Sequence, residues 1–276
     1  MADVKQIEQC EKSANQIRKD IINMAYSLGN LGAHLGGSLS MAEMLAVLYT
    51  KVINYDNTNP NWEERDRVIL SKGHAALALY PALVQAGVID RERLSEFKQN
   101  GSQLSAHPSL NGLPGIEFAS GSLGQGLSLG IGVSMALKRK ENVKSKVYVF
   151  LGDGECDEGS VWEAAASASH YGLSRLVAIV DANAIQYDGL TDEVMKMNPW
   201  AKKWENFGWK VVEVDGHEVG QLLDAFHTES NNPLAIIAHT VKGKGISFME
   251  GDKQYHNARI TEKQYEIAMQ ELGEAI

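Results

Sequence analysis

The feature that most constrains the fold is a strand, helix, strand succession between residues 146 and 183. The apolar run KVYVFL (146–151) leads into GDGECDEGS (152–160), a helical segment begins at Ser160, and LVAIVDAN (176–183) is typical of a second strand. Such a unit places its two strands in parallel, and strands that are apolar throughout belong to a sheet covered on both sides. We therefore predict an α/β fold, with a parallel β-sheet flanked by helices on both faces.

Other segments continue this alternation along the chain. Further strands are predicted near residues 68–70, 209–214 and 234–241, and helices over residues 4–28, 40–49, 126–140 and 219–227, from about His74 and from Thr261. Ser40 with Glu43 three residues later predicts a capped helix start. Because 276 residues suffice for one α/β domain and no linker divides them, we predict a single domain over residues 1–276.

Glycines recur in the helical segment 126–140. Gly126, Gly130 and Gly132 have no side chain to hold this helix away from a neighbouring element. We expect all three to allow close packing.

Polar residues follow both strands of the central unit. Asp153 comes just after the first strand and Asn183 ends the second. Ligands of open parallel sheets bind beyond the carboxyl ends of the strands, and glycines beside Asp153 let backbone N–H groups approach a phosphate. A carboxylate repels phosphate unless a hard cation lies between them, and Mg²⁺ accepts carboxylate, amide and phosphate oxygens together. We predict a divalent metal held by Asp153, Asn183 and the backbone carbonyl of Ile185.

Each motif alone also has a plain structural interpretation. GDG is typical of a tight turn, and Asn183 is typical of a turn or helix cap. Their matching positions after two neighbouring strands favour the metal site.

Together these motifs resemble the thiamine diphosphate motif of the transketolase family, in which GDG is followed by an asparagine about 30 residues later. The resemblance runs through GDGECDEGSVWEAAASASHYGLSRLVAIVDANAIQYDG, AHLGGSLS, DRVILSKGHAALALY, SAHP, LPGIEFASGSLGQGLSLGIG and KGKGISFME, and it covers about residues 15–258. It implies a diphosphate-binding domain, thiamine diphosphate as cofactor, and Mg²⁺, Ca²⁺ or Mn²⁺ as the metal held by Asp153, Asn183 and Ile185.

The resemblance also assigns roles around the cofactor. Gly154 would present its N–H to the diphosphate, and Gly121, Ser122 and Leu123 would line the aminopyrimidine pocket. Ser122 stands where the family usually has proline, a position expected to act through backbone atoms. Glu158 resembles a glutamate at the family's dimer interface, and its alternative role is to stabilise a helix N-terminus. We expect Glu155 and Asp157 to be solvated charges at that helix start.

Histidines match four family positions. His74 and His256 resemble residues near the diphosphate and thiazolium, and His34 and His107 resemble residues around the substrate hydroxyls. Imidazole suits these tasks because it donates and accepts hydrogen bonds and exchanges protons near neutral pH. The alternative for any single histidine is a surface or satisfied core residue. Asn257 follows His256 where glycine is common in the family.

The resemblance covers only the diphosphate-binding part of a transketolase. The pyrimidine-binding and C-terminal domains, with their cofactor glutamate and sugar-phosphate contacts, are expected on a separate subunit, in an α2β2 assembly inactive without it. The complete enzyme would transfer a two-carbon ketol unit from a ketose or ketose phosphate to an aldose or aldose phosphate. Alternatives are a transketolase-like enzyme for a sulfosugar or apulose phosphate, a relative of deoxyxylulose-phosphate synthase, and a non-catalytic binding subunit with the same fold.

Composition excludes several other classes. A formal net charge of -9 argues against a nucleic-acid partner. The N-terminal residues have no apolar core of a signal peptide, and no apolar stretch approaches the length of a membrane span. The two cysteines, Cys10 and Cys156, form no metal or disulfide motif, so a reducing cytoplasm is expected. We expect Cys156 to have no functional role, although a nearby helix N-terminus could lower the pKa of its thiol.

Overall fold

A five-stranded parallel sheet organises the chain, and it confirms the predicted α/β fold. The computed structural model describes residues 3–140 and 144–274. The strands are β1 (Arg67–Leu70), β2 (Val147–Gly152), β3 (Leu176–Ala182), β4 (Lys210–Asp215) and β5 (Leu234–His239). They lie in the order β1-β2-β3-β5-β4, and every neighbouring pair is parallel. β1 and β4 are therefore the edge strands, and the carboxyl ends of all strands share one edge of the sheet.

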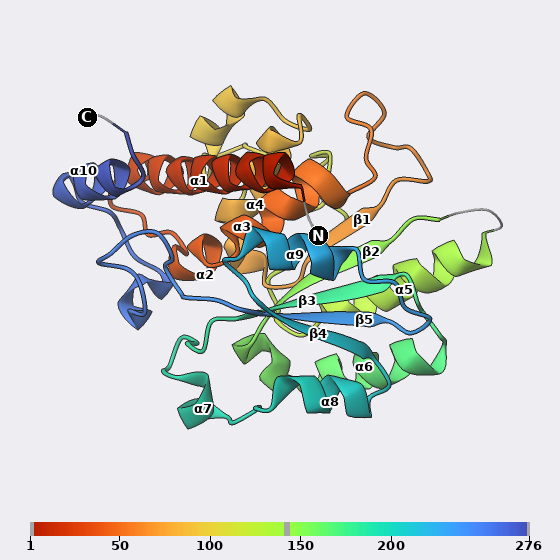
Figure 1. Cartoon of the computed structure of the whole chain (residues 1–276). Helices are drawn as coiled ribbons and strands as arrows, with labels where there is room; N and C mark the ends of the chain where they lie inside the picture. The colour runs from red at the N-terminus through yellow and green to blue at the C-terminus, as the bar shows by residue number, and fades with distance from the viewer. Residues whose placement is uncertain (1–2, 141–143, 275–276) are drawn as a thin grey trace.

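Helices cover both faces of this sheet (Figure 1). On one face lie α1 (Val4–Ser27), α3 (Ala42–Val47), α4 (Ala76–Gln85) and α9 (Val219–Phe226), and on the other lie α5 (Gly126–Arg139), α6 (Gly159–His170) and α8 (Trp200–Asn206). The remaining elements are α2 (Gly36–Leu39), α7 (Thr191–Val194), α10 (Glu262–Glu271) and the short helices η1 (Leu48–Val52), η2 (Gly73–Ala75), η3 (Arg91–Glu96), η4 (Gly154–Asp157) and η5 (Lys253–His256).

Alternate side chains of each strand enter different cores. In β2, Tyr148 and Phe150 join the core beneath α1, whereas Val147, Val149 and Leu151 join the core beneath α5 and α6. This period of two follows from the pleat of a strand. Because both faces are apolar, β2 is buried along its whole length, as the sequence predicts for a covered parallel sheet.

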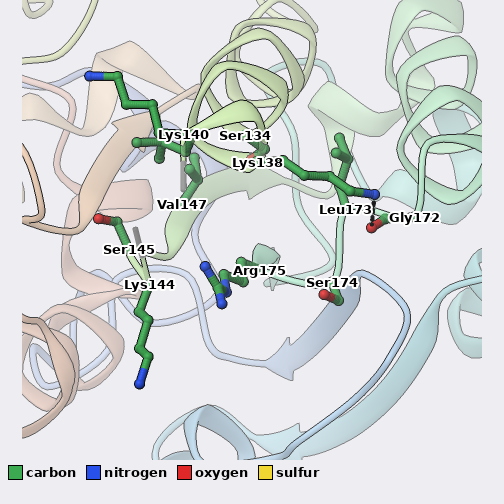
Figure 2. A pocket seen from close by; sticks show the side chains of 11 residues that line it. Ser134, Lys138, Lys140, Lys144, Ser145, Val147, Gly172, Leu173, Ser174 and Arg175 are labelled. Atoms are coloured by element: carbon green, nitrogen blue, oxygen red, sulfur yellow. Dashed lines mark hydrogen bonds between the residues drawn. The ribbon is translucent and has the colours of Figure 1, made fainter. Parts of the chain in front are cut away.

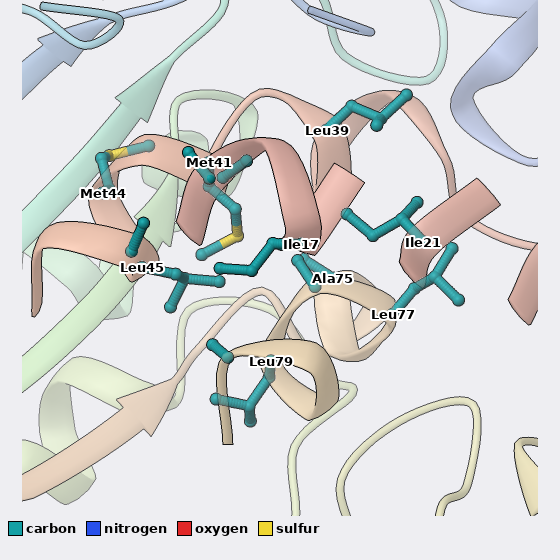
Figure 3. Packing of buried hydrophobic residues seen from close by; sticks show 14 of the residues in the cluster. Ile17, Ile21, Leu39, Met41, Met44, Leu45, Ala75, Leu77 and Leu79 are labelled. Carbon is teal, nitrogen blue, oxygen red and sulfur yellow. The ribbon is translucent and has the colours of Figure 1, made fainter. Parts of the chain in front are cut away.

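The larger core forms under α1. Figure 3 shows Ile17 and Ile21 of α1 packing among side chains of α3, such as Leu45, and of α4, such as Leu77 and Leu79. These side chains are at most 3% exposed. Their burial fixes the helices that carry the loops beyond the carboxyl ends of the strands.

Two glycines let α5 lie against the sheet. A Cβ atom on Gly126 would lie 2.4 Å from the Cβ of Ser71, and one on Gly130 would lie 2.6 Å from Cγ2 of Val149. Gly132 has no neighbour within 4 Å of the same position. The expected close packing is thus confirmed for two glycines and wrong for the third.

The predicted capping role of Ser40 is wrong. The helix begins later, at Ala42, with Met41 at its N-cap and no side-chain cap. The Ser40 hydroxyl donates instead to Oδ2 of Asp181 at 2.6 Å, in β3. Ser40 therefore makes a hydrogen bond to a residue distant in the sequence in place of the local helix cap that the sequence favours.

The described residues include no helix with the length and apolar character needed to span a membrane.

Candidate active site

Asp153 lies one residue beyond β2 and is only 4% exposed. Its Oδ1 accepts a hydrogen bond from the N–H of Gly154 at 2.9 Å, and its Oδ2 accepts one from the N–H of Ala184 at 2.6 Å. Burial, together with the nearby Asp181 carboxylate, raises the pKa of Asp153 to about 6. The side chain therefore ties the loop after β2 to the loop after β3.

The loop after β3 carries oxygen atoms close to Asp153. Asn183 is 8% exposed, donates from Nδ2 to Asp181 at 3.0 Å, and accepts at Oδ1 from the N–H of Ile185 at 3.2 Å. The backbone of Ala184 has a positive φ of 65°, a conformation that residues other than glycine rarely adopt. This strained turn directs the chain across the end of the sheet, beside Asp153.

A cavity of about 340 Å³ opens beyond the ends of β2 and β3 and gathers most of the predicted residues. Those that line it are His34, His74, His107, Gly121, Leu123, Asp153, Gly154, Asn183, Ile185 and His256. Residues from several separate loops therefore meet at one place. Ser122 and Glu158 do not line this cavity.

The four predicted histidines form one cluster. The ring centroid of His34 lies 5.3 Å from that of His74, 5.7 Å from that of His107 and 5.5 Å from that of His256. The ring centroids of His74 and His256 are 5.2 Å apart. These residues are spread over most of the sequence, and the fold brings all four to the lining of one cavity.

These imidazoles are neutral at pH 7. Burial and then the neighbouring His107 lower the pKa of His34 to about 4, and burial followed by the charge of Lys242 lowers that of His256 to about 4. Burial also lowers the pKa of His74 to about 2 and that of His107 below its usual value. Each ring consequently offers one donor and one acceptor to a polar ligand.

A buried ion pair lies beneath the cavity, and the sequence interpretation missed it. Lys72 donates to Oδ2 of Asp181 and, at 2.8 Å, to the carbonyl of Gly37. Asp181 is fully buried, and it also accepts from Ser40 and Thr240. Although burial alone would raise the pKa of Asp181, the Lys72 ammonium and these hydrogen bonds hold it below its usual value. A carboxylate inside an apolar strand was the available signal, because such a charge requires a partner.

Lys242 is a second missed residue. It lies in the glycine-flanked segment KGKG, is 2% exposed, and donates from Nζ to the carbonyl of Ile185 at 2.7 Å and to Nδ1 of His256 at 3.0 Å. Because an ammonium only donates, Nδ1 of His256 is the acceptor and its ring proton is on Nε2. Burial lowers the pKa of Lys242 to about 8, against the opposing charge of Asp153.

The expectation that Glu155 is a solvated charge is wrong. Glu155 is 3% exposed, and it accepts hydrogen bonds from Ser71, from the N–H of Gly124 at 2.8 Å and from the N–H of Gly152 at 3.0 Å. Burial raises its pKa. It therefore joins the loops after β1 and β2 to the loop before α5. Asp157 is half-buried rather than solvated.

Burial also decides the state of Cys156. The thiol is fully buried, which raises its pKa instead of allowing the lowering that a helix N-terminus would cause.

The rim of the cavity is exposed. Gly121, Ser122 and Leu123 lie at the surface, and a Cβ on Gly121 would lie 3.8 Å from the His107 ring. Glu158 is also exposed and occupies the N-cap position of α6 without a side-chain cap. The N–H of Gly154, predicted to face a diphosphate, donates to Asp153 in this structure.

The donor set fits a hard cation. No group of three His, Cys, Asp or Glu side chains that would hold a metal occurs in residues 3–140 and 144–274. A metal here would instead use one carboxylate oxygen of Asp153, the amide oxygen of Asn183 and the carbonyl of Ile185, which are the oxygen types that Mg²⁺ and Ca²⁺ accept. The Ile185 carbonyl already receives a cation, the ammonium of Lys242. The residues present therefore fit the predicted metal.

Comparison with known proteins identifies the family. Residues 10–275 match the family model described as transketolase, thiamine diphosphate binding domain. The chain belongs to the transketolase family. The resemblance inferred from the GDG motif and the distant asparagine is thereby confirmed.

Two transketolase relatives match this chain over nearly their whole length. The 6-deoxy-6-sulfo-D-fructose transketolase subunit of Clostridium sp. (strain MSTE9) is 40% identical over 266 residues, which cover 95% of each chain. An apulose-4-phosphate transketolase subunit of Phocaeicola vulgatus is 39% identical over 274 residues, 98% of this chain and 96% of that protein.

A solved transketolase shares the fold. The crystal structure of a Pichia stipitis transketolase in complex with sedoheptulose-7-phosphate superposes with a TM-score of 0.88 and 30% identity. The match covers 97% of this chain but only 41% of that one. This chain therefore corresponds to less than half of that transketolase.

Proposed function

We propose that this chain is the thiamine diphosphate-binding subunit of a two-subunit transketolase, which transfers a two-carbon ketol unit from a ketose to an aldose. The observation that carries the proposal is the single cavity in which Asp153, Asn183 and the Ile185 carbonyl meet the histidine cluster. Support also comes from relatives that are named as transketolase subunits and match this chain over their length.

The oxygens at the ends of β2 and β3 would hold the metal and the diphosphate. Asp153, Asn183 and Ile185 would supply the oxygen ligands, and the N–H of Gly154 would be available to the diphosphate with a cation bound to Asp153. Thiamine diphosphate supplies the chemistry that breaks and forms carbon–carbon bonds next to a carbonyl. We propose Mg²⁺ as the metal because its ligands include one or two carboxylates and phosphate oxygens.

The histidines bind and orient polar groups. Burial, and after it the charges of Lys72 beside His74 and of Lys242 beside His256, lower the pKa values of these two histidines, so both rings would stay neutral near an anionic group. His34 and His107 form the other side of the cluster and would hydrogen-bond to sugar hydroxyls. A neutral ring holds a hydroxyl proton at its acceptor nitrogen and gives one from its donor nitrogen, which suits proton movement during ketol transfer.

A separate partner would complete the site. Gly121, Ser122 and Leu123 at the exposed rim would contact the aminopyrimidine ring, and Glu158 would face the partner. We propose that the partner carries the pyrimidine-binding and C-terminal domains, that the assembly is α2β2, and that it acts in the cytoplasm. An exposed rim around a buried, polar cavity supports this arrangement.

The sugar is the least constrained part of the proposal. A specialised substrate is the second candidate, because one relative is named for 6-deoxy-6-sulfo-D-fructose and another for apulose-4-phosphate. Contacts to a sugar's phosphate or sulfonate would lie on the partner.

The test is reconstitution. We expect ketol transfer only when this chain is combined with its pyrimidine-domain partner, thiamine diphosphate and Mg²⁺, assayed with sedoheptulose 7-phosphate, 6-deoxy-6-sulfo-D-fructose and apulose 4-phosphate as donors. Full activity of the chain alone would contradict the partner requirement.

Two variants separate this proposal from a non-catalytic binding role. Asp153→Ala should abolish metal-dependent binding of thiamine diphosphate in the assembled complex, whereas Glu158→Ala should retain cofactor binding and weaken association with the partner. Unchanged cofactor affinity in Asp153→Ala would favour the non-catalytic alternative.

A further inference from the structure

A buried ionic network lies outside the candidate active site and joins α1, α3 and the loop after β4. The guanidinium group of Arg18 donates to Oε2 of Glu43 at 2.6 Å, and the same oxygen lies 3.1 Å from Nδ1 of His217. The side chains of Arg18, Glu43 and His217 are only 8%, 11% and 14% exposed. Charges taken out of water need partners, and this network supplies them. We call these three residues the Arg18–Glu43–His217 network.

Hydrogen bonds fix the tautomer of His217. The backbone N–H of Val241 donates to Nε2 of His217 at 2.8 Å, so Nε2 carries no proton and the ring proton is on Nδ1. Nδ1 therefore donates to Glu43. Burial alone would raise the pKa of Glu43, but the hydrogen bond from His217 and the charge of Arg18 hold it below its usual value. Glu43 is thus an anion that orients the two side chains beside it.

The network also holds both ends of a short backbone segment. His217 accepts from the N–H of Val241, and Nε of Arg18 donates to the carbonyl of Lys244 at 2.9 Å. Lys242 lies between these two contacts in the sequence. The backbone on either side of Lys242 is therefore held by side chains that lie outside the cavity.

The Lys242 side chain reaches from this segment into the candidate active site. Its ammonium donates to the carbonyl of Ile185 at 2.7 Å and to Nδ1 of His256 at 3.0 Å. The Ile185 carbonyl is one of the predicted metal ligands. Because lysine has a flexible four-carbon stem, its ammonium keeps one position only when the backbone that carries it is fixed.

A purely structural explanation accounts for part of the network. The pair of Arg18 and Glu43 joins α1 to α3, and this alone would satisfy both buried charges. Other bonds also restrain the segment, such as that from the N–H of Gly243 to the carbonyl of Gly36 at 3.0 Å. Neither explanation requires side chains of the network to bond to the backbone on both sides of Lys242.

We propose that the Arg18–Glu43–His217 network positions Lys242 in the candidate active site. Its members are positioning residues, because they act on the site through Lys242 and do not line the cavity themselves. The consequence for cofactor binding rests on the proposed function. The position of Lys242 can be measured without any cofactor.

The test follows the His256 ring by nitrogen NMR of the full chain labelled with isotopically enriched histidine, in EDTA. Signals of His256 are assigned by their loss in His256→Gln. In the wild-type chain Nδ1 of His256 accepts from Lys242, so its proton should be on Nε2. Lys242→Met removes this donor, and the ring should then exchange between both tautomers. His217→Leu, which releases the Val241 N–H, should produce the same change.

Two matched controls break similar contacts elsewhere. His239→Leu removes an exposed imidazole that lies 2.9 Å from the Glu213 carboxylate and is not part of the network. Lys138 lines a cavity at the amino end of β2, and Figure 2 shows its Nζ at the carbonyl of Gly172, 3.1 Å away. Lys138→Met therefore removes a lysine–carbonyl bond at the opposite edge of the sheet. Both controls should retain the wild-type tautomer of His256.

A second variant covers a failure of His217→Leu to fold, judged by circular dichroism. Arg18→Lys supplies the same measurement, because one ammonium cannot occupy the positions of both the Nε and the terminal nitrogen that Arg18 uses. An unchanged His256 tautomer in the folded variant, or the same change in either control, would overturn the proposal.

Cofactor binding tests the consequence separately. In the complex with the pyrimidine-domain partner and Mg²⁺, His217→Leu should weaken binding of thiamine diphosphate by about tenfold in isothermal titration calorimetry, as expected for one displaced charge-assisted hydrogen bond. In a Lys242→Met background the same substitution should have little further effect, because residues that act through one another are not additive. Additive losses would overturn the positioning role. A wild-type complex that binds no thiamine diphosphate would instead contradict the proposed function, and the result for His256 would stand.

Discussion

Replacing Lys72 by methionine tests how the floor of the candidate active site is stabilised. Lys72 and Asp181 have side chains only 2% and 1% exposed, and the ammonium is one of four donors to this carboxylate. Methionine fills much of the same volume but leaves the carboxylate without a cation. Removing one partner of a buried ion pair costs about 3–5 kcal/mol. For a total stability of about 5–15 kcal/mol, this loss is large.

The chain offers a matched surface pair as the control. Lys140 and Glu63 also form an ion pair, but their side chains are 50% and 77% exposed. Since solvent screens such a pair, Lys140→Met should cost at most about 1 kcal/mol. Both variants are compared by urea unfolding in EDTA, followed by tryptophan fluorescence and far-UV circular dichroism. A loss in Lys72→Met as small as that in Lys140→Met would refute the reasoning.

The pH dependence gives a second criterion for the same variant. In the wild-type chain the pKa of Asp181 is below its usual value, so the pair's contribution is complete above the unfolded-state pKa and disappears as pH falls through the folded-state pKa. Without Lys72, burial raises the pKa of Asp181 instead. The deficit of Lys72→Met should therefore shrink as the pH is lowered, because a protonated Asp181 needs no cation. A deficit that stays constant across the acidic range would assign the loss to packing.

Three further predictions follow from the buried contacts. Gly130→Ala should destabilise the chain by about 1–3 kcal/mol, because the new Cβ would meet Val149. Gly132→Ala, in the same helix, should be neutral or stabilising by up to about 1 kcal/mol. Urea unfolding of both variants measures the difference, and equal effects would contradict the close packing at Gly130. Glu155→Ala should lower the stability by about 2–3 kcal/mol, because three donors lose their acceptor. Replacing the exposed Glu158 by alanine should change the stability by less than about 0.5 kcal/mol. Equal effects of the two variants in thermal unfolding would contradict the buried position of Glu155. Because the pKa of Asp153 is raised to about 6, the metal-free chain should lose about 2 kcal/mol relative to Asp153→Asn as pH rises from 4 to 7, measured by urea unfolding in EDTA; parallel pH profiles would contradict it.

Much of the fold, and the meeting of several candidate site residues, is predictable from local sequence. Continuous apolar strands such as β2 and β3 predict a covered parallel sheet, and residues just after them, such as Asp153 and Asn183, must meet at one sheet edge. The histidines were identified by their short motifs. Only the fold brings the rings of His34 and His256 to a centroid distance of 5.5 Å, because that contact depends on the packing of distant loops.

The contacts beneath the site were not predictable in the same way. Ser40 has a sequence typical of a helix cap, yet its hydroxyl bonds to Asp181, 141 residues later. Glu155 looks like a solvated acid at a helix start, but it accepts hydrogen bonds from two loops and from the last residue of β2. Lys72 and Lys242 are found buried only when the tertiary structure is known. Local patterns describe the neighbours along the chain, whereas these residues are defined by neighbours in space.

The edge strands affect whether separate copies of the chain aggregate through their sheets. The outer side of β4 pairs with no other strand of the described chain, and an unpaired strand edge invites a second molecule to extend the sheet into an aggregate. In β4, however, Lys210, Glu213 and Asp215 are exposed, and the other edge strand, β1, spans only Arg67–Leu70. The charged residues of β4 and the short length of β1 both oppose extension of the sheet by a second molecule. Both features therefore oppose association of separate copies through the edges of their sheets.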